Sequence, residues 1–358
     1  MSSSLAVPSQ AALVVCLALG LALAGVPHAG ATEAEPQGGA ALYAKYCALC
    51  HGADAKGYAA DNAPSLITPQ FLSGADDSFL VNSIALGRPE TAMAAYGKQS
   101  GGPLSNEQIG EIVAFLRTHG PAHGPLPKEP AGSARRGAAV YSATCSSCHG
   151  DRSKRATAIH LANPTFLALA SDDFLYDSIA RGRDGTPMKA YAEELDGEQI
   201  SDVVAYLRTW ATGAPPALIR PREATSEGPA VLNPDGQAPA FTLRDQTYVP
   251  ADEVKRAFDE KRRMVIVDAR VTSDWERERI TGAISVPYYA LAGLDRIPND
   301  GTWVVAYCAC PHHASGVIVT ELRKRGYPHT AVLDEGVLVW KERGYPTAGA
   351  GVAAQAGQ

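Results

Sequence analysis

The chain has 358 residues, 46% of them hydrophobic, and a formal net charge of −6 at pH 7. This length predicts two or three domains, and the composition is typical of a soluble protein whose domains each bury a core. The charge is mildly acidic and no block of Lys or Arg occurs, which excludes a strongly basic binding surface. We therefore expect no nucleic-acid partner.

The N-terminus has the features of an export signal. Residues 11–26 are uncharged and apolar but too short for a comfortable transmembrane span, and the small residues 29–31 follow them. We predict a signal peptide over residues 1–31, which includes Cys16, and a bacterial protein exported to the periplasm. Because the first ten residues contain no Lys or Arg, an uncleaved segment associated with the membrane is the alternative.

Two copies of the motif Cys-x-x-Cys-His occupy residues 47–51 and 145–149. In such a motif the two thiols add to haem vinyl groups as thioethers, and the histidine ligates the iron. A zinc knuckle or a redox dithiol is the alternative for a single copy, but two copies in a matching context favour haem c. The sequence therefore predicts two covalently attached haem c groups. The attachment residues are Cys47, Cys50, Cys145 and Cys148, and the iron ligands are His51 and His149.

An internal repeat surrounds the two motifs. Three segments recur in the same order and show apolar residues at helical spacing. The matching pairs are 39–43 with 137–141, 84–96 with 179–191, and 107–118 with 198–209. Capping boxes at Ser105 with Gln108 and at Asp196 with Gln199 are expected to start the closing helices. Each repeat thus predicts a small helical domain of a size that suits one haem.

The two repeats resemble class I cytochrome c, in which a helix, CxxCH, a methionine-bearing loop and a closing helix surround one haem. The resemblance covers residues 37–120 and 133–212. It implies two all-α domains whose task is electron transfer, because an iron with six ligands has no open position for a substrate. It also implies that Met93 and Met188, which occupy equivalent repeat positions, are the sixth ligands. Packing of these methionines in the core is the alternative.

Three further histidines each occur in only one repeat. We interpret them as surface or loop residues and not as iron ligands. They are His119 and His123 in the first repeat and His160 in the second.

A change of composition marks a third domain. Residues 213–246 are rich in Pro, Gly and Ala, which predicts a linker. Short apolar runs at 265–268 and 303–307 then alternate with helical patterns. This alternation predicts an α/β domain with a parallel sheet over residues 247–346, followed by a flexible tail at 347–358.

Cys308 follows the second apolar run, where a strand leads into a short loop and a helix. Backbone N–H groups and the helix dipole favour an anion at such a position. We therefore expect a stabilised thiolate, the nucleophilic form of cysteine, and take Cys308 as the candidate catalytic residue.

This region resembles the rhodanese family of sulfurtransferases. The matching segments, in order, are 267–270, 279–287, 305–308 and 322–327, then Leu333, Gly336 and Trp340. The resemblance implies that Cys308 carries sulfane sulfur as a persulfide and passes it to an acceptor. Four departures argue against ordinary thiosulfate-to-cyanide transfer. They are Pro311 in the loop, His313 in place of a basic residue, Arg279 in place of a histidine and Glu335 in place of a glycine.

Cys310 stands two residues beyond Cys308. It could resolve a persulfide on Cys308 and leave a disulfide. Alternatively, the two cysteines could bind a soft metal ion together with His312 and His313, or the loop could be an inert structural element.

Together these features predict a periplasmic dihaem electron-transfer protein whose rhodanese-like domain binds or transfers sulfur through Cys308. Its expected partners are electron donors and acceptors of a respiratory chain and a small reduced sulfur compound, which it would help to oxidise. One alternative is an electron shuttle whose rhodanese-like module serves docking or redox sensing without catalysis. Another is a metal-handling loop fed by the haems.

Overall fold

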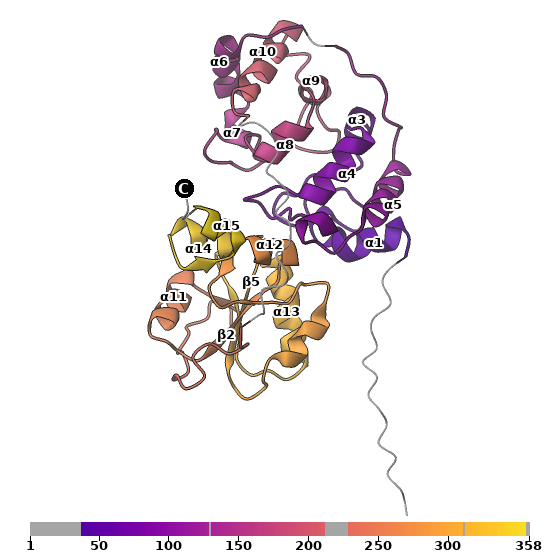
Figure 1. Cartoon of the computed structure of the whole chain (residues 1–358). Helices are drawn as coiled ribbons and strands as arrows, with labels where there is room; N and C mark the ends of the chain where they lie inside the picture. Colours follow the sequence, from indigo (N-terminus) through magenta and orange to yellow (C-terminus); the bar gives the residue numbers. More distant parts are fainter. Residues whose placement is uncertain (1–36, 129, 212–227, 311, 356–358) are drawn as a thin grey trace, which may run out of the picture. The chain divides into compact units, whose positions relative to one another are not determined.

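The computed structural model of the chain describes residues 37–128, 130–211, 228–310 and 312–355. Two helical repeats are followed by an α/β domain (Figure 1), which confirms the predicted fold class. The predicted signal peptide, with Cys16, lies outside the described residues. Within the described ranges, no helix is both long and apolar enough to cross a membrane.

The two repeats have corresponding helices. The first contains α1 (Gly39–Tyr46), α2 (Ala48–His51), α3 (Pro69–Gly74), α4 (Asp77–Leu86), the 3₁₀ helix η1 (Lys98–Ser100) and α5 (Asn106–Arg117). The second contains α6 (Ala134–Thr144), α7 (Ser146–His149), α8 (Pro164–Leu169), α9 (Asp172–Arg181) and α10 (Gly197–Arg208). The side chains of Thr68 and Asn163 cap α3 and α8, and a proline begins both helices. Both predicted capping boxes, before α5 and α10, are present.

The first and last helices of each repeat cross in close contact, because a glycine stands at the crossing. A Cβ atom on Gly39 would lie 1.9 Å from the carbonyl oxygen of Glu111 in α5. A Cβ atom on Gly137 would lie at the same distance, 1.9 Å, from the carbonyl oxygen of Asp202 in α10. The glycine that recurs in the sequence therefore allows the backbones of α1 and α5, and of α6 and α10, to approach.

Aromatic rings and two arginines join the repeats. Four phenylalanines lie together between them: Phe71, Phe79, Phe166 and Phe174. The Arg88 guanidinium of the first repeat lies over Phe166 of the second, and Arg183 of the second lies over Phe71 of the first. Burial lowers the pKa of both arginines to about 10. Equivalent arginines of the two repeats thus contribute to the two sides of this contact.

The α/β domain is built on a five-stranded parallel sheet with the strand order β1-β6-β5-β2-β4. Its elements are β1 (Tyr248–Val249), α11 (Ala251–Asp259), β2 (Met264–Asp268), α12 (Thr272–Arg277), β3 (Arg279–Ile280), β4 (Ile284–Ser285), η2 (Leu291–Arg296), β5 (Trp303–Tyr307), α13 (His313–Lys324), β6 (Thr330–Leu333), α14 (Gly336–Glu342), β7 (Thr347–Ala348) and α15 (Ala350–Gln355). Alternate strand residues point to opposite faces. Val265 and Val267 therefore pack with α13 and η2, whereas Met264 and Ile266 pack with α11 and α14.

Parts of the predicted linker and of the predicted tail make contacts with the α/β domain. Within the predicted linker, Leu232 exchanges backbone hydrogen bonds with Met264, and Phe241 and Leu243 pack against the α/β core. Within the predicted tail, β7 pairs antiparallel with β3, and α15 follows. In both segments the backbone groups find partners far away in the sequence, which local composition does not reveal.

We expect Gly182→Ala to destabilise the second repeat more than Gly185→Ala. Both glycines have left-handed φ values, +62° and +71°, but only a Cβ atom at Gly182 would clash, 2.4 Å from the carbonyl carbon of Lys189. The free energy of unfolding should fall by more than ~2 kcal/mol for Gly182→Ala and by about 1 kcal/mol for Gly185→Ala. Urea unfolding followed by circular dichroism measures both variants, and equal losses would contradict the steric argument.

Candidate functional site

The first CxxCH motif forms a tight helical corner between α1 and α2. The Cys47 N–H donates to the Tyr43 carbonyl at 2.8 Å, and the His51 N–H donates to the Cys47 carbonyl at 3.0 Å. The side chain of His51 is buried, and its Nδ1 lies 2.9 Å from the Pro64 carbonyl oxygen. A proton on Nδ1 would donate to this carbonyl and leave the Nε2 lone pair available to a metal.

The second motif has the same geometry. The Cys145 N–H donates to the Tyr141 carbonyl at 2.8 Å, and the His149 Nδ1 lies 3.0 Å from the Ile159 carbonyl oxygen. Burial lowers the pKa of both motif histidines, which favours the neutral imidazole that ligates metals. Two thiols on one helical turn and an imidazole with an oriented Nε2 fit a covalently attached haem c at each motif.

The two predicted methionine ligands occupy equivalent loops. In each loop, the arginine that follows the helix-ending glycine donates its N–H to the methionine carbonyl at 2.7 Å. The methionine N–H in turn contacts a threonine hydroxyl two residues earlier, at 3.1 Å for Met93 and 3.2 Å for Met188. Both side chains are half-buried, and Met93 packs against the core of the first repeat. Ligation of iron through these two sulfur atoms stays a prediction.

The three other histidines of the repeats have backbone partners. His119 and His123 are exposed and contact the carbonyl oxygens of Phe115 and Ser73 through Nδ1. His160 contacts the Asp151 carbonyl through Nε2 at 3.0 Å.

Cys308 lies directly after β5 and before α13, in the strand-loop-helix setting that its sequence predicts. Its side chain is 2% exposed, and its Sγ lies 3.3 Å from the Ser315 Oγ. The Sγ of Cys310, which is 5% exposed, lies 3.7 Å from that of Cys308. Residues 308–310, the cysteine loop, therefore hold two buried thiols side by side at the start of α13.

The surroundings of Cys308 favour the neutral thiol over the expected thiolate. Its hydrogen bond with Cys310 and then its burial raise the pKa of Cys308 well above the ordinary value. Hydrogen bonds from the hydroxyl and the N–H of Ser315 lower this pKa, but by less. The prediction of a stabilised thiolate is therefore wrong for this state, because the hydrogen bond and burial outweigh the donors at the helix start.

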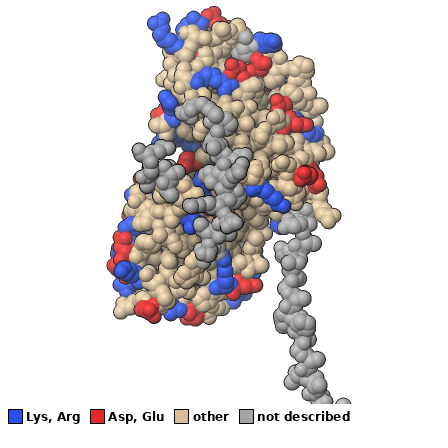
Figure 2. Space-filling model, in the orientation of Figure 1, with Lys and Arg blue, Asp and Glu red and all other residues tan. Residues whose placement is uncertain are grey.

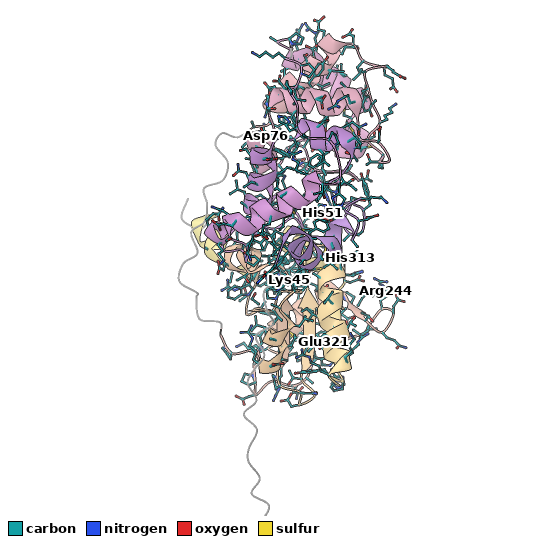
Figure 3. All side chains as sticks on the ribbon, turned by 90° about the vertical axis from the view of Figure 1, so that its right-hand side faces the viewer. Lys45, His51, Asp76, Arg244, His313 and Glu321 are labelled. Atoms are coloured by element: carbon teal, nitrogen blue, oxygen red, sulfur yellow. The ribbon has the colours of Figure 1, made fainter. Side chains whose placement is uncertain are left out.

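The cysteine loop contacts the first CxxCH motif within the unit formed by residues 36–358. The side chains of Cys50 and Cys310 lie close enough to interact electrostatically. Leu49 packs against the core that contains Cys308. The helix that carries Cys50, α2, lies against α13. Figure 3 marks His51, where α2 ends, and His313, where α13 begins. In the second repeat the equivalent cysteine, Cys148, is exposed.

Hydroxyl groups of the α/β domain hold this contact together. Tyr288 donates to the Tyr46 carbonyl at 2.7 Å and accepts from the Tyr96 hydroxyl at 3.1 Å. The Ser273 Oγ donates to the Ala95 carbonyl at 2.6 Å. Sequence reasoning missed these residues, because no local pattern links two groups that stand 178 or 242 positions apart.

His312 is bonded to groups other than the cysteines. Its Nε2 lies 2.9 Å from the Asp334 Oδ1, and its ring packs on Tyr248 with centroids 4.0 Å apart. Across the part of the chain that the structure describes, no group of three or more His, Cys, Asp or Glu side chains is arranged to hold a metal ion.

Two departures from the rhodanese pattern serve packing in the α/β domain. The Arg279 guanidinium lies over the Trp275 ring, 4.0 Å from its centroid. Glu335 accepts a hydrogen bond from the Ala251 N–H at the start of α11, at 2.8 Å. Of the other two departures, His313 is the exposed first residue of α13, and Pro311 lies outside the described residues.

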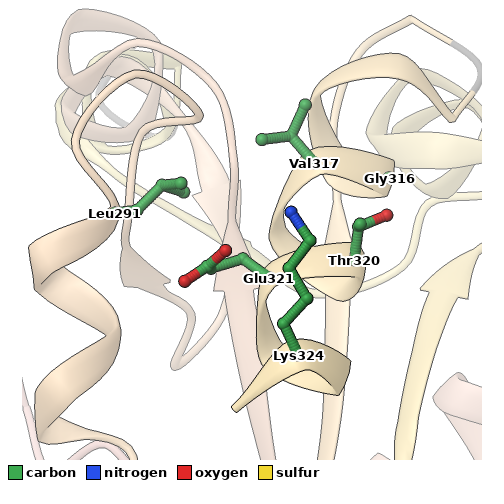
Figure 4. A pocket seen from close by; sticks show the side chains of 6 residues that line it. All are labelled: Leu291, Gly316, Val317, Thr320, Glu321 and Lys324. Carbon is green, nitrogen blue, oxygen red and sulfur yellow. The ribbon is translucent and has the colours of Figure 1, made fainter.

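The outer face of α13 carries a surface pocket of about 380 Å³, which η2 closes on the other side (Figure 4). Its lining residues are Leu291, Gly316, Val317, Thr320, Glu321 and Lys324. These include no cysteine or histidine, so the pocket supplies none of the chemistry considered above. Figure 2 shows acidic and basic side chains interspersed over the visible face, in keeping with the mild net charge.

Comparison with known proteins gives family matches for both parts of the chain. Residues 34–116 and 132–207 match the family described as cytochrome c oxidase, cbb3-type, subunit III, and residues 250–343 match the rhodanese-like domain. The cbb3-type cytochrome c oxidase subunit CcoP of Azospirillum sp. (strain B510) is 28% identical over 195 residues. The subunit FixP of Bradyrhizobium sp. (strain ORS 278) is 28% identical over 185 residues. These alignments cover 49% of this chain and 62% and 61% of the relatives, so the chain spans about three fifths of their length.

Two solved structures are similar to part of the chain. A reducing HAO-like protein complex of Kuenenia stuttgartiensis, with 20% identity and a TM-score of 0.33, covers 48% of this chain and 95% of that chain. A rhodanese-like domain from Anabaena sp., with 24% identity and a TM-score of 0.28, covers 30% of this chain and 81% of that chain. The family matches and the architecture together show that this chain consists of two cytochrome c domains, a type that binds haem c covalently, followed by a rhodanese-like domain.

Proposed function

We propose that this protein is a periplasmic dihaem cytochrome whose rhodanese-like domain takes up sulfur from a small reduced sulfur compound on Cys308. The observation that carries the proposal is the packing of α2, which carries Cys50, against α13, with Leu49 packed against the core around Cys308. A residue that would attach a haem is in direct contact with the cysteine loop. When bound, haem c supplies one-electron oxidation and reduction.

The residues of the two CxxCH motifs would hold two haems. In this proposal Cys47, Cys50, Cys145 and Cys148 would form the thioethers. His51 with Met93 would ligate one iron, and His149 with Met188 would ligate the other. Both imidazoles direct Nδ1 at a backbone carbonyl, which leaves Nε2 for the iron. An iron with two axial side chains has no open position for a substrate, so sulfur chemistry requires another residue.

Cys308 is the residue proposed for this chemistry. Its thiol and one hydrosulfide ion would combine to an anionic persulfide with the release of two protons and two electrons, and the two haems would accept one electron each. The hydroxyl of Ser315, 3.3 Å from the Cys308 sulfur, and the N-terminal end of α13 are placed to stabilise the anionic persulfide.

The relatives support a respiratory role for the cytochrome domains. CcoP and FixP are subunits of cbb3-type cytochrome c oxidases. We propose that this chain likewise exchanges electrons with donor and acceptor proteins of a respiratory chain.

A second candidate is an electron shuttle whose rhodanese-like domain only docks or senses. The burial of Cys308 favours it, because a sulfur donor must reach a side chain that is 2% exposed. Mass spectrometry after incubation with polysulfide discriminates the two functions. An added sulfur atom on Cys308 supports sulfur uptake, and an unmodified Cys308 supports the docking module.

Replacement of either ligand methionine should lower the reduction potential of one haem. A thioether ligand favours reduced iron, so Met93→Leu and Met188→Leu should each affect one of two haem transitions in a redox titration. Met264→Leu is the matched control, because Met264 is fully buried in the sheet of the rhodanese-like domain. If the ligand variants leave both transitions unchanged, as the control should, the methionine assignment is wrong.

Cys308→Ser should abolish haem reduction by sulfide. The oxidised protein is mixed anaerobically with sulfide while haem absorbance is followed. The control Thr320→Ala changes an exposed residue of α13 and should react like the wild type. Equal rates in the wild type and Cys308→Ser would contradict coupling between sulfur uptake and electron transfer.

The reactivity of Cys308 should keep rising at alkaline pH. Because its pKa is raised, the thiolate fraction still grows above the ordinary cysteine pKa of about 8.5, where a normal thiol approaches saturation. Timed alkylation by iodoacetamide, read by peptide mass spectrometry across this range, measures the profile. An alkylation rate that stops rising at or below about pH 8.5, the ordinary cysteine pKa, would contradict a pKa raised by burial.

A further inference from the structure

The cysteine loop contains a second thiol to which the proposed function gives no role. The sulfur atoms of Cys308 and Cys310 lie 3.7 Å apart, and both cysteines are free. Both side chains are also buried, at 2% and 5% exposure. Thiols at this distance need only a small movement to join as a disulfide.

Cys310 has a third sulfur as its neighbour. Its thiol interacts electrostatically with that of Cys50, which in the haem-loaded protein would be the thioether link to the first haem. The packing of α2 against α13 and of Leu49 against the core around Cys308 supports the same contact independently. The equivalent cysteine of the second repeat, Cys148, is exposed. The dithiol therefore adjoins the first haem site.

We propose that Cys308 and Cys310 are a redox-active pair that delivers electrons to the first haem as it closes to a disulfide. This proposal rests on the proposed function for its electron acceptors. One S–S bond forms and two S–H bonds break, with the release of two protons to solvent and two electrons. The electrons would leave one at a time, and the two haem c groups of the chain, when bound in the ferric state, would accept one each.

The disulfide provides a route by which sulfur is loaded. A hydrosulfide ion attacks the Cys308 sulfur, the S–S bond breaks, and Cys310 leaves as a thiolate while Cys308 becomes a persulfide. This step needs no oxidant, because the two electrons have already passed to the haems. Among the described hydrogen bonds, Ser315 contacts the sulfur of Cys308 and not that of Cys310. We therefore assign the attack of the hydrosulfide ion to the Cys308 sulfur.

The test follows the thiols and the haems of the full chain together. Under argon, the fully reduced protein is oxidised stepwise with ferricyanide, and samples are quenched and digested. As the haems become ferric, the wild-type peptide that contains Cys308 and Cys310 should lose the mass of two hydrogen atoms. The wild type should also consume two more oxidising equivalents than Cys310→Ser.

Two paired variants test the route through the first haem. Cys47→Ala/Cys50→Ala removes the attachment of the first haem. In this variant Cys308 and Cys310 should remain thiols during the time in which the wild type forms the disulfide. The matched control, Cys145→Ala/Cys148→Ala, removes the attachment of the second haem and should still form the disulfide.

The inference is overturned if the wild-type peptide keeps both thiols while both haems are ferric. Disulfide formation at an unchanged rate in Cys47→Ala/Cys50→Ala overturns it equally, because ferricyanide would then oxidise the thiols directly. The peptide mass of the wild type tests the inference even if Cys310→Ser fails to fold. If sulfide reduces the haems in a reaction that requires Cys308 but no disulfide forms, this inference is refuted and the proposed function stands. If sulfide reduces the haems equally fast in Cys308→Ser, the proposed function is refuted.

Discussion

The contact between the cysteine loop and the first CxxCH motif depends on a few hydrogen bonds to backbone carbonyls. Tyr288 donates to the Tyr46 carbonyl, and Ser273 donates to the Ala95 carbonyl. A buried carbonyl that loses its donor costs about 1–3 kcal/mol, so these bonds favour one arrangement of the two surfaces. The proposed coupling of sulfur uptake to electron transfer requires this arrangement, because it keeps Cys310 next to Cys50.

The duplicated cytochrome domains share a scaffold but differ in their surroundings. Both use a glycine at the crossing of the first and last helices, a capping box on the closing helix and the same hydrogen bonds in the methionine loop. The rhodanese-like domain contacts the first motif, whereas Cys148 of the second is exposed. In the proposed function the first site would therefore receive electrons from the cysteine loop, and the second would exchange them with an external redox protein.

The sequence was sufficient to predict the elements whose signals are local. The CxxCH motifs, the capping boxes of α5 and α10 and the apolar strands β2 and β5 depend on residues that lie close together in the chain, and the structure has the predicted helices and strands there. The position of Cys308 between β5 and α13 follows from the same short-range pattern.

The remaining features depend on distant residues or on burial. The hydrogen bond from Tyr288 joins groups 242 positions apart, and β7 finds its partner in β3 across the domain. The raised pKa of Cys308 illustrates the same limit. A position before a helix predicts a thiolate, but the neighbouring Cys310 and the complete burial of the side chain are properties of the folded domain and reverse the direction.

The most direct measurement of the central claim is the rate of haem reduction by sulfide in proteins that retain only one attached haem. In the protein without the second haem, Cys145→Ala/Cys148→Ala, the first haem should accept one electron as fast as in the first phase of the wild type, and the haem of a second chain should accept the other. The protein without the first haem, Cys47→Ala/Cys50→Ala, should react far more slowly, and circular dichroism is the control for its folding. If the second haem alone is reduced at the wild-type rate, electrons do not pass from the cysteine loop through the first site, and the account is wrong.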